Sequence, residues 1–92
     1  MSTKQERSQR AEAELEVGRS LEAAIRKNVM HDLGWPADLH QVQVRLLWEG
    51  NYRVNVFVGS DAASAKVAHS FFLTADAAGE VLVSTPAITR LY

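Results

Sequence analysis

The stretch LHQVQVRLLWEGNYRVNVFV, residues 39–58, opens the region 39–82 that decides the fold of this chain. Apolar residues occupy every second position in two runs, one on each side of the turn-forming pair Gly50-Asn51. Two further runs with the same spacing follow at 67–73 and 81–85. Because successive side chains of a strand point to opposite faces of a sheet, this period of two predicts four short strands that share one apolar face.

Loops at 49–51, 60–66 and 75–79 bring these runs into one antiparallel register. The apolar pairs that this register predicts are Trp48 with Tyr52, Leu46 with Val54, Val44 with Val56, Val58 with Val67, Val54 with Phe71, Leu73 with Val81, and Phe71 with Val83. A slip of one residue would move a whole apolar set to the opposite face, so the agreement among three loops supports the register.

Residues 1–32 are predicted to form one helix with two unlike halves. The second half carries an apolar stripe at helical spacing, made of Val17, Leu21, Ala24, Ile25, Val29 and Leu33. Gly34, followed by Trp35-Pro36, is a strong stop signal for this helix. The first half is rich in helix-forming polar residues and has no apolar face, so we expect residues 1–14 to be a polar extension, mobile from Met1 to about Arg10.

The remaining residues, 15–92, are expected to form a single α+β domain, in which the helix packs on one face of a four-stranded antiparallel meander. We expect Leu21, Ile25 and Val29 to face Leu46, Val54, Val56 and Phe71. The apolar tail at 87–92 is expected to dock on its own domain or on a partner.

This element order resembles the cystatin-like arrangement, in which the sheet curls around the helix. Cystatin inhibitors carry a Gln-x-Val-x-Gly hairpin motif, whereas this chain has Gln41-Val42-Gln43-Val44-Arg45. The resemblance therefore implies a fold and does not carry over protease inhibition.

The composition narrows the function classes. A net charge of −1 creates no field that would attract nucleic acid or an anionic membrane. The absence of cysteine excludes disulfides, thiolate catalysis and cysteine metal sites. No apolar run is long enough to cross a bilayer, and the polar start of the sequence has no signal-peptide pattern, so we expect a cytoplasmic protein.

The candidate chemical groups also fit structural roles. The three histidines, His31, His40 and His69, lack the spacing of a zinc or iron site, and His31 suits a helix C-terminus. His69 is expected on the core face opposite Thr85, either as a buried or half-buried polar group that bonds to Thr85 or to the helix, or as a ligand-binding or acid–base residue. No serine lies in a Gly-x-Ser-x-Gly elbow and no phosphate-binding loop is present, so we expect neither an enzyme nor a cofactor.

The outer face of the sheet carries the clearest functional signal. In the predicted register, one row across the sheet contains Leu47, Arg53, Phe72 and Leu82, with Phe57 two positions further along its strand. A solvated sheet face should be polar, so this row is either covered by the stem of Arg53 or a contact patch.

Two function classes follow. The first is a non-enzymatic module that binds a protein partner or itself, as a homodimer, through the outer face, an edge strand or the projecting helix. The second is a ligand-binding or enzymatic domain with a pocket between helix and sheet near His69. The large apolar residues of the core face leave little space for a pocket, which favours the first.

Overall fold

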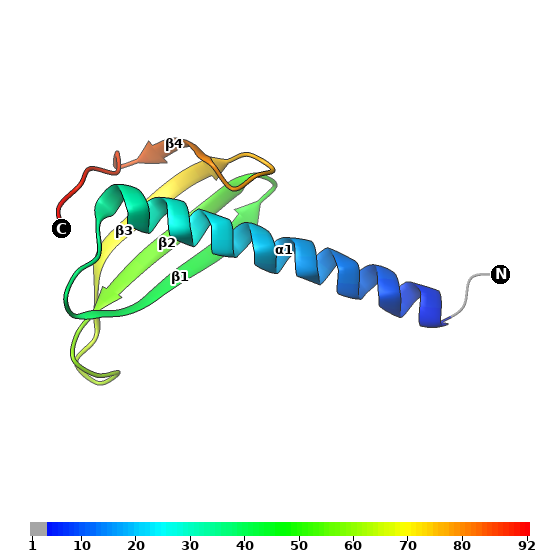
Figure 1. Ribbon diagram of the computed structural model, residues 1–92, viewed down its shortest axis with the longest axis horizontal. Coiled ribbons are helices and arrows are strands. Elements are labelled where there is room, and N and C mark those ends of the chain that lie inside the picture. The colour runs from blue at the N-terminus through cyan, green and yellow to red at the C-terminus, as the bar shows by residue number, and fades with distance from the viewer. Residues whose placement is uncertain (1–3) are drawn as a thin grey trace.

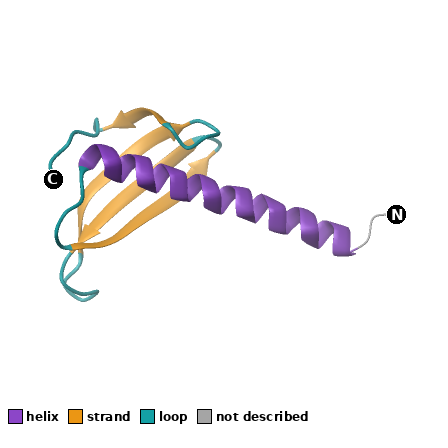
Figure 2. Ribbon diagram, viewed as in Figure 1, coloured by secondary structure: helices purple, strands orange, loops and turns teal. Residues whose placement is uncertain are grey.

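The computed structural model describes residues 4–92, with side chains described from residue 11. Its elements are α1 (Lys4–Leu33), β1 (Leu39–Trp48), β2 (Asn51–Val58), β3 (Lys66–Ala75) and β4 (Val81–Thr85). The strands form one antiparallel sheet in the order β1-β2-β3-β4, and α1 lies across one face of it (Figure 2). The predicted α+β class and meander order are confirmed. Within residues 4–92, no helix is long and apolar enough to span a bilayer.

The core lies between the C-terminal half of α1 and the inner face of the sheet. Its buried apolar residues are Ile25, Val29, Met30, Leu33, Val42, Tyr52, Val54, Val56, Phe71, Leu73 and Ala75, with Leu21 and Val44 partly buried against them. The helical stripe and the period-two face therefore meet as expected. The exception is Leu46, which is 55% exposed because the helix has already left the sheet at that point.

The N-terminal half of α1 projects beyond the sheet (Figure 1). Residues 11–20 are all exposed, and among the side chains described from residue 11, Leu21 is the first that packs on the core. The molecule is accordingly elongated, measuring 54 × 31 × 18 Å. We call the end of the sheet from which α1 projects the helix-exit end; it carries the loops 49–50 and 76–80. Met1–Thr3 lie outside the described residues, and the mobility expected up to Arg10 stays a prediction.

Two of the predicted hairpin registers are wrong. The β1–β2 loop has two residues and not three, and this shorter loop together with the irregularity between Leu46 and Trp48 pairs Val44 with Val54. This shift of two residues keeps Val44 on the inner face. The β3–β4 register breaks between Thr74 and Ala75, so Val83 lies opposite Thr74 on the outer face. The period-two pattern does not signal an irregularity of this kind, because it assumes an unbroken ladder.

The β2–β3 register is correct in its centre, where Val54 pairs with Phe71. A further irregularity follows Val56, and beyond it Val67 pairs with Phe57. Val67 consequently leaves the predicted core face and is 49% exposed.

The loop 76–80 is held closely against α1. The Asn28 side chain donates a hydrogen bond of 2.8 Å to the carbonyl oxygen of Gly79. Gly79 has a φ of 83°, and a Cβ at this position would lie 2.6 Å from the Cβ of Ala24. Glycine is therefore required here both for the backbone conformation and for the close approach.

The C-terminal tail docks on its own domain, one of the two placements expected. The backbone amides of Leu91 and Tyr92 donate to the carbonyl oxygen of Leu33, at 2.9 and 3.2 Å. This carbonyl is one of those that a helix end leaves without an intrahelical partner. Ile88 adds an apolar contact with the core.

Candidate functional site

The outer face of the sheet carries an exposed aromatic pair at the helix-exit end. The β1–β2 ladder shifts between Leu46 and Trp48, so Trp48 pairs with Asn51. The shift turns the indole to the outer face, where its ring centroid lies 5.6 Å from that of Phe72. Trp48 is 59% exposed there. The prediction that Trp48 faces Tyr52 in the core is therefore wrong, because the irregular hairpin reverses the direction of the side chain.

Aliphatic residues extend this aromatic pair along the same end of the sheet. Val83 faces outward opposite Thr74 and is 65% exposed, whereas it was expected opposite Phe71 in the core. Leu47 and Leu82 lie at the two register irregularities and are also exposed. We call the surface formed by Leu47, Trp48, Phe72, Leu82 and Val83 the exit patch.

The row that crosses the sheet beside the exit patch differs from the predicted one. It contains Arg45, Arg53, Phe72 and Thr85. Leu47 and Leu82 are therefore absent from it, although both remain near its ends. Arg45 and Arg53 lie directly opposite each other, and like charges in this position disfavour the pairing. Neither arginine has a carboxylate within ion-pair distance among the side chains described from residue 11.

A network of hydrogen bonds separates the exit patch from the far end of the outer face. Arg53 donates to the hydroxyl of Ser70 at 3.1 Å, and this hydroxyl donates to the Asn55 side chain at 2.6 Å. Phe57 lies beyond this network, paired with Val67 and half-buried. The structure thus does not join Phe57 to Phe72. The Arg53 guanidinium is held within the network, and the ring of Trp48 packs against that of Phe72.

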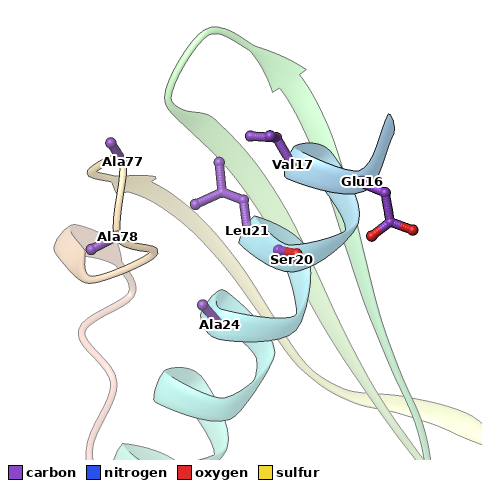
Figure 3. Close-up of a pocket in the computed structure, with 7 residues that line it drawn as sticks. All are labelled: Glu16, Val17, Ser20, Leu21, Ala24, Ala77 and Ala78. Carbon is purple, nitrogen blue, oxygen red and sulfur yellow. The ribbon is translucent and has the colours of Figure 1, made fainter. Parts of the chain in front are cut away.

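A shallow groove opens on the inner face at the helix-exit end. One part is lined by Val17, Leu21 and Ala24 of α1 and by Ala77 and Ala78 of the facing loop (Figure 3). The groove continues past Leu21 to the exposed side chain of Leu46. Apolar surface therefore reaches the helix-exit end from both faces of the sheet, with the tip of β1 between them.

His69 has a different partner from the one expected. Its Nε2 lies 2.8 Å from the hydroxyl of Tyr92, and its ring stacks on Phe71 with centroids 6.1 Å apart. Thr85, the expected partner, instead pairs with Phe72. The imidazole is half-buried and is engaged by the C-terminal residue. Among the side chains described from residue 11, no group of three or more histidine, aspartate and glutamate residues is placed to hold a metal ion.

The structure shifts the pKa values of two titratable groups, Tyr52 and Asp61. Burial raises the pKa of the Tyr52 phenol, and the nearby charge of Glu22 adds to the effect. Hydrogen bonds from the backbone and side chain of Ser64 lower the pKa of Asp61, which lies in the β2–β3 loop. Tyr52 belongs to the core and Asp61 to a turn, so these two groups do not form an acid–base pair.

Comparison of the chain with protein-family models, with curated proteins and with solved structures found no match. The candidate site therefore rests on the chemistry and geometry of its own residues.

The residues that sequence reasoning missed are Trp48 and Val83. Both residues fit the period-two pattern of the sequence. Both also lie beyond a ladder irregularity that turns their side chains to the opposite face of the sheet. One signal was present in the β1–β2 hairpin, where the two-residue loop Glu49-Gly50 has Gly50 at a φ of 74°. Glycine in the second position of such a loop is typical of a tight hairpin.

Proposed function

We propose that this chain is a non-enzymatic association module that pairs with a second copy of itself through the exit patch. The observation that carries the proposal is the exposed Trp48 packed against Phe72, beside a polar, hydrogen-bonded network on the same face. Tryptophan is the residue type most enriched among those that contribute strongly to protein interfaces. A large exposed aromatic flanked by leucine and valine side chains is what a protein contact needs.

Two features favour a second copy as the occupant. The net charge of −1 produces little repulsion between identical molecules. The same chain also supplies residues 11–20, an exposed helical segment with three glutamates and one arginine, and an arginine pair that has no carboxylate within ion-pair distance among the side chains described from residue 11. One copy therefore carries both halves of a complementary surface. Binding to a different protein is the competing outcome of the test.

The second function class, a ligand-binding or enzymatic domain near His69, is less well supported. The imidazole is engaged by Tyr92 and stacked on Phe71, and large apolar side chains fill the core between helix and sheet. The contacts of His69 with Tyr92 and Phe71 give no support to a substrate site at the imidazole.

Sedimentation equilibrium tests self-association directly. The wild-type chain should approach twice its mass of 10.2 kDa as the concentration rises, and Trp48→Glu should shift the equilibrium to the monomer. Trp35→Glu is the matched control, because Trp35 is similarly exposed, at 62%, but lies just after the C-terminus of α1. A wild-type chain that stays monomeric at millimolar concentration overturns the proposal, as does a Trp48→Glu dimer that is as stable as the wild type.

A further inference from the structure

Residues 11–20 of α1 have no tertiary partner in the part of their own chain that the structure describes. They are all exposed, and among the side chains described from residue 11 the contact of α1 with the core begins at Leu21. A helical segment of this length is marginal in water when nothing packs against it. The segment therefore needs a second surface if it is to be as well ordered as the rest of the helix.

The core-facing stripe of α1 continues into this exposed half. Its positions recur at alternating steps of four and three residues, which keeps them on one side of a helix: Ala11, Leu15, Gly18, Glu22, Ile25 and Val29. Ile25 and Val29 face the sheet of their own chain, so Ala11, Leu15 and Gly18 point to the same side beyond the edge of that sheet. Leu15 is 57% exposed, and no atom of the sheet lies near Gly18.

Accepting the self-association proposed above, we infer that the dimer forms by reciprocal docking of these helices. The segment 4–20 of each copy lies across the outer face of the other copy. Leu15 and the gap at Gly18 receive the rings of Trp48 and Phe72, and Glu14 faces the arginine pair. The inference rests on the proposed function and names the part of the second copy that occupies the exit patch.

The geometry of one chain permits this arrangement for both copies at once. The two sheets lie end to end in one layer, related by a two-fold axis at their helix-exit ends. Each helix then leaves the inner face of its own sheet and passes over the outer face of the other, because the rotation turns the second sheet over. The interface is the same patch on both subunits, as a two-fold axis requires.

The length of the projecting helical segment also matches the length of the sheet that it would cover. The 17 residues from Lys4 to Ser20 extend about 25 Å at 1.5 Å per residue, and an eight-residue strand such as β2 extends about 26 Å. A helix about 10 Å wide leaves a footprint of about 250 Å² over this length. Two helices, each covering an equal area of sheet, bury about 1,000 Å², which reaches the size expected of a specific interface.

The charges of residues 11–20, the part of the segment nearest its own sheet, complement the arginine pair. These ten residues contain three glutamates and one arginine, whereas residues 4–10 contain two arginines, one lysine and one glutamate, so the segment 4–20 as a whole has no net charge. Of the glutamates, Glu14 lies about 20° from the direction of Ile25 around the helix, whereas Glu16 lies about 180° from it. Glu14 would therefore approach Arg45 and Arg53, which disfavour each other in the isolated chain. Glu16 would point away from the partner sheet.

A charge exchange tests the inference separately from self-association. Glu14→Arg and Arg53→Glu should each weaken the dimer about tenfold or more, measured by sedimentation equilibrium, because each places like charges together. The double variant Glu14→Arg/Arg53→Glu should recover most of the lost affinity. Glu16→Arg is the matched control and should leave the dimer nearly unchanged, and circular dichroism checks that each variant is folded.

The outcomes separate the two proposals. If the wild type does not dimerise, the proposed function fails, and with it the inference. If the wild type dimerises and Trp48→Glu abolishes the dimer, but Glu14→Arg has no effect and the double variant shows no rescue, the exit patch binds another surface. In that case the reciprocal docking of the helices is wrong, and self-association through the exit patch stands.

Discussion

The Nε2 of His69 and the hydroxyl of Tyr92 lie 2.8 Å apart, which ties the last residue of the chain to the third strand. The same terminal residue donates its backbone amide to the carbonyl oxygen of Leu33 at the end of α1. The C-terminus therefore bridges the helix and the sheet at the end opposite the exit patch.

Removing the hydroxyl should weaken this bridge without disturbing the core. Tyr92→Phe keeps the ring and its edge-on contact with His69 but deletes the hydrogen bond, so it should lower the free energy of unfolding by about 0.5–1.5 kcal/mol. Urea unfolding measures the change. Ser84→Ala is a suitable comparison, because its hydroxyl donates locally to the carbonyl oxygen of Pro86 and not between elements. Equal stability of Tyr92→Phe and the wild type would mean that the bond contributes nothing.

The contact between helix and sheet should dominate stability. Ile25 is completely buried, so Ile25→Ala should cost about 2–5 kcal/mol through lost apolar contacts and the cavity that remains. Leu91→Ala shortens a side chain that is 61% exposed and should change the free energy of unfolding by no more than about 0.5 kcal/mol. If both variants melt like the wild type, Ile25 does not hold the helix on the sheet.

The helix–sheet contact and the docked C-terminal tail were predictable from the sequence to different degrees. The strand faces that meet the helix were predictable, because Val54, Val56 and Phe71 lie in uninterrupted alternation and pair with regular geometry at their centre. The tail was expected to dock, but its partner was not, since contacts distant in sequence leave no local pattern. His69 was placed on the correct strand face with the wrong partner.

The outer face was predicted less well for a definite reason. Trp48, Val67 and Val83 each lie just beyond a ladder irregularity, and each moved from the predicted core face to the exposed one. An extra residue in one strand reverses the face of every later side chain, and the alternation of apolar residues does not show where that extra residue lies. The candidate surface was correctly assigned to the outer face, but its main residue was missed.

The close contact between loop 76–80 and α1 should be sensitive to a single methyl group. Gly79→Ala introduces a Cβ at positive φ and places it 2.6 Å from the Cβ of Ala24, so the loop must shift away from the helix. Gly50→Ala is the matched control, because its φ is also positive but the nearest atom to its Cβ would be 3.6 Å away. Gly50→Ala should cost about 1 kcal/mol for the backbone alone.

Thermal or urea unfolding should therefore show a larger loss for Gly79→Ala than for Gly50→Ala. The difference between the two variants measures the close approach to Ala24. Losses of equal size would show that the loop moves without cost and that the hydrogen bond from Asn28 does not hold it in place.

The buried phenol of Tyr52 should make the fold sensitive to alkaline pH. Its pKa is raised above the ordinary value of 10.0 by burial and by Glu22. Above about pH 10 the unfolded chain releases a proton that the folded chain retains, so the free energy of unfolding falls as the pH rises. The contribution is fully present below the unfolded pKa. Tyr52→Phe cannot ionise, so its stability should decline less between about pH 9 and pH 11 in urea titrations. Parallel declines would assign the alkaline loss to other groups.

The exposed half of α1 should become ordered only when the dimer forms. At concentrations where the chain is monomeric, the amides of residues 11–20 should exchange with solvent much faster than those around Ile25, because these ten residues are all exposed within the part of the chain that the structure describes. As the concentration rises, hydrogen-exchange mass spectrometry should show protection growing in this segment and in the strand residues around Phe72 together. Trp48→Glu should suppress the protection at both places, while Trp35→Glu should leave it intact. Strong protection of residues 11–20 in the monomer would show that the segment is stable alone, and protection of the helix without the strand would place its partner elsewhere.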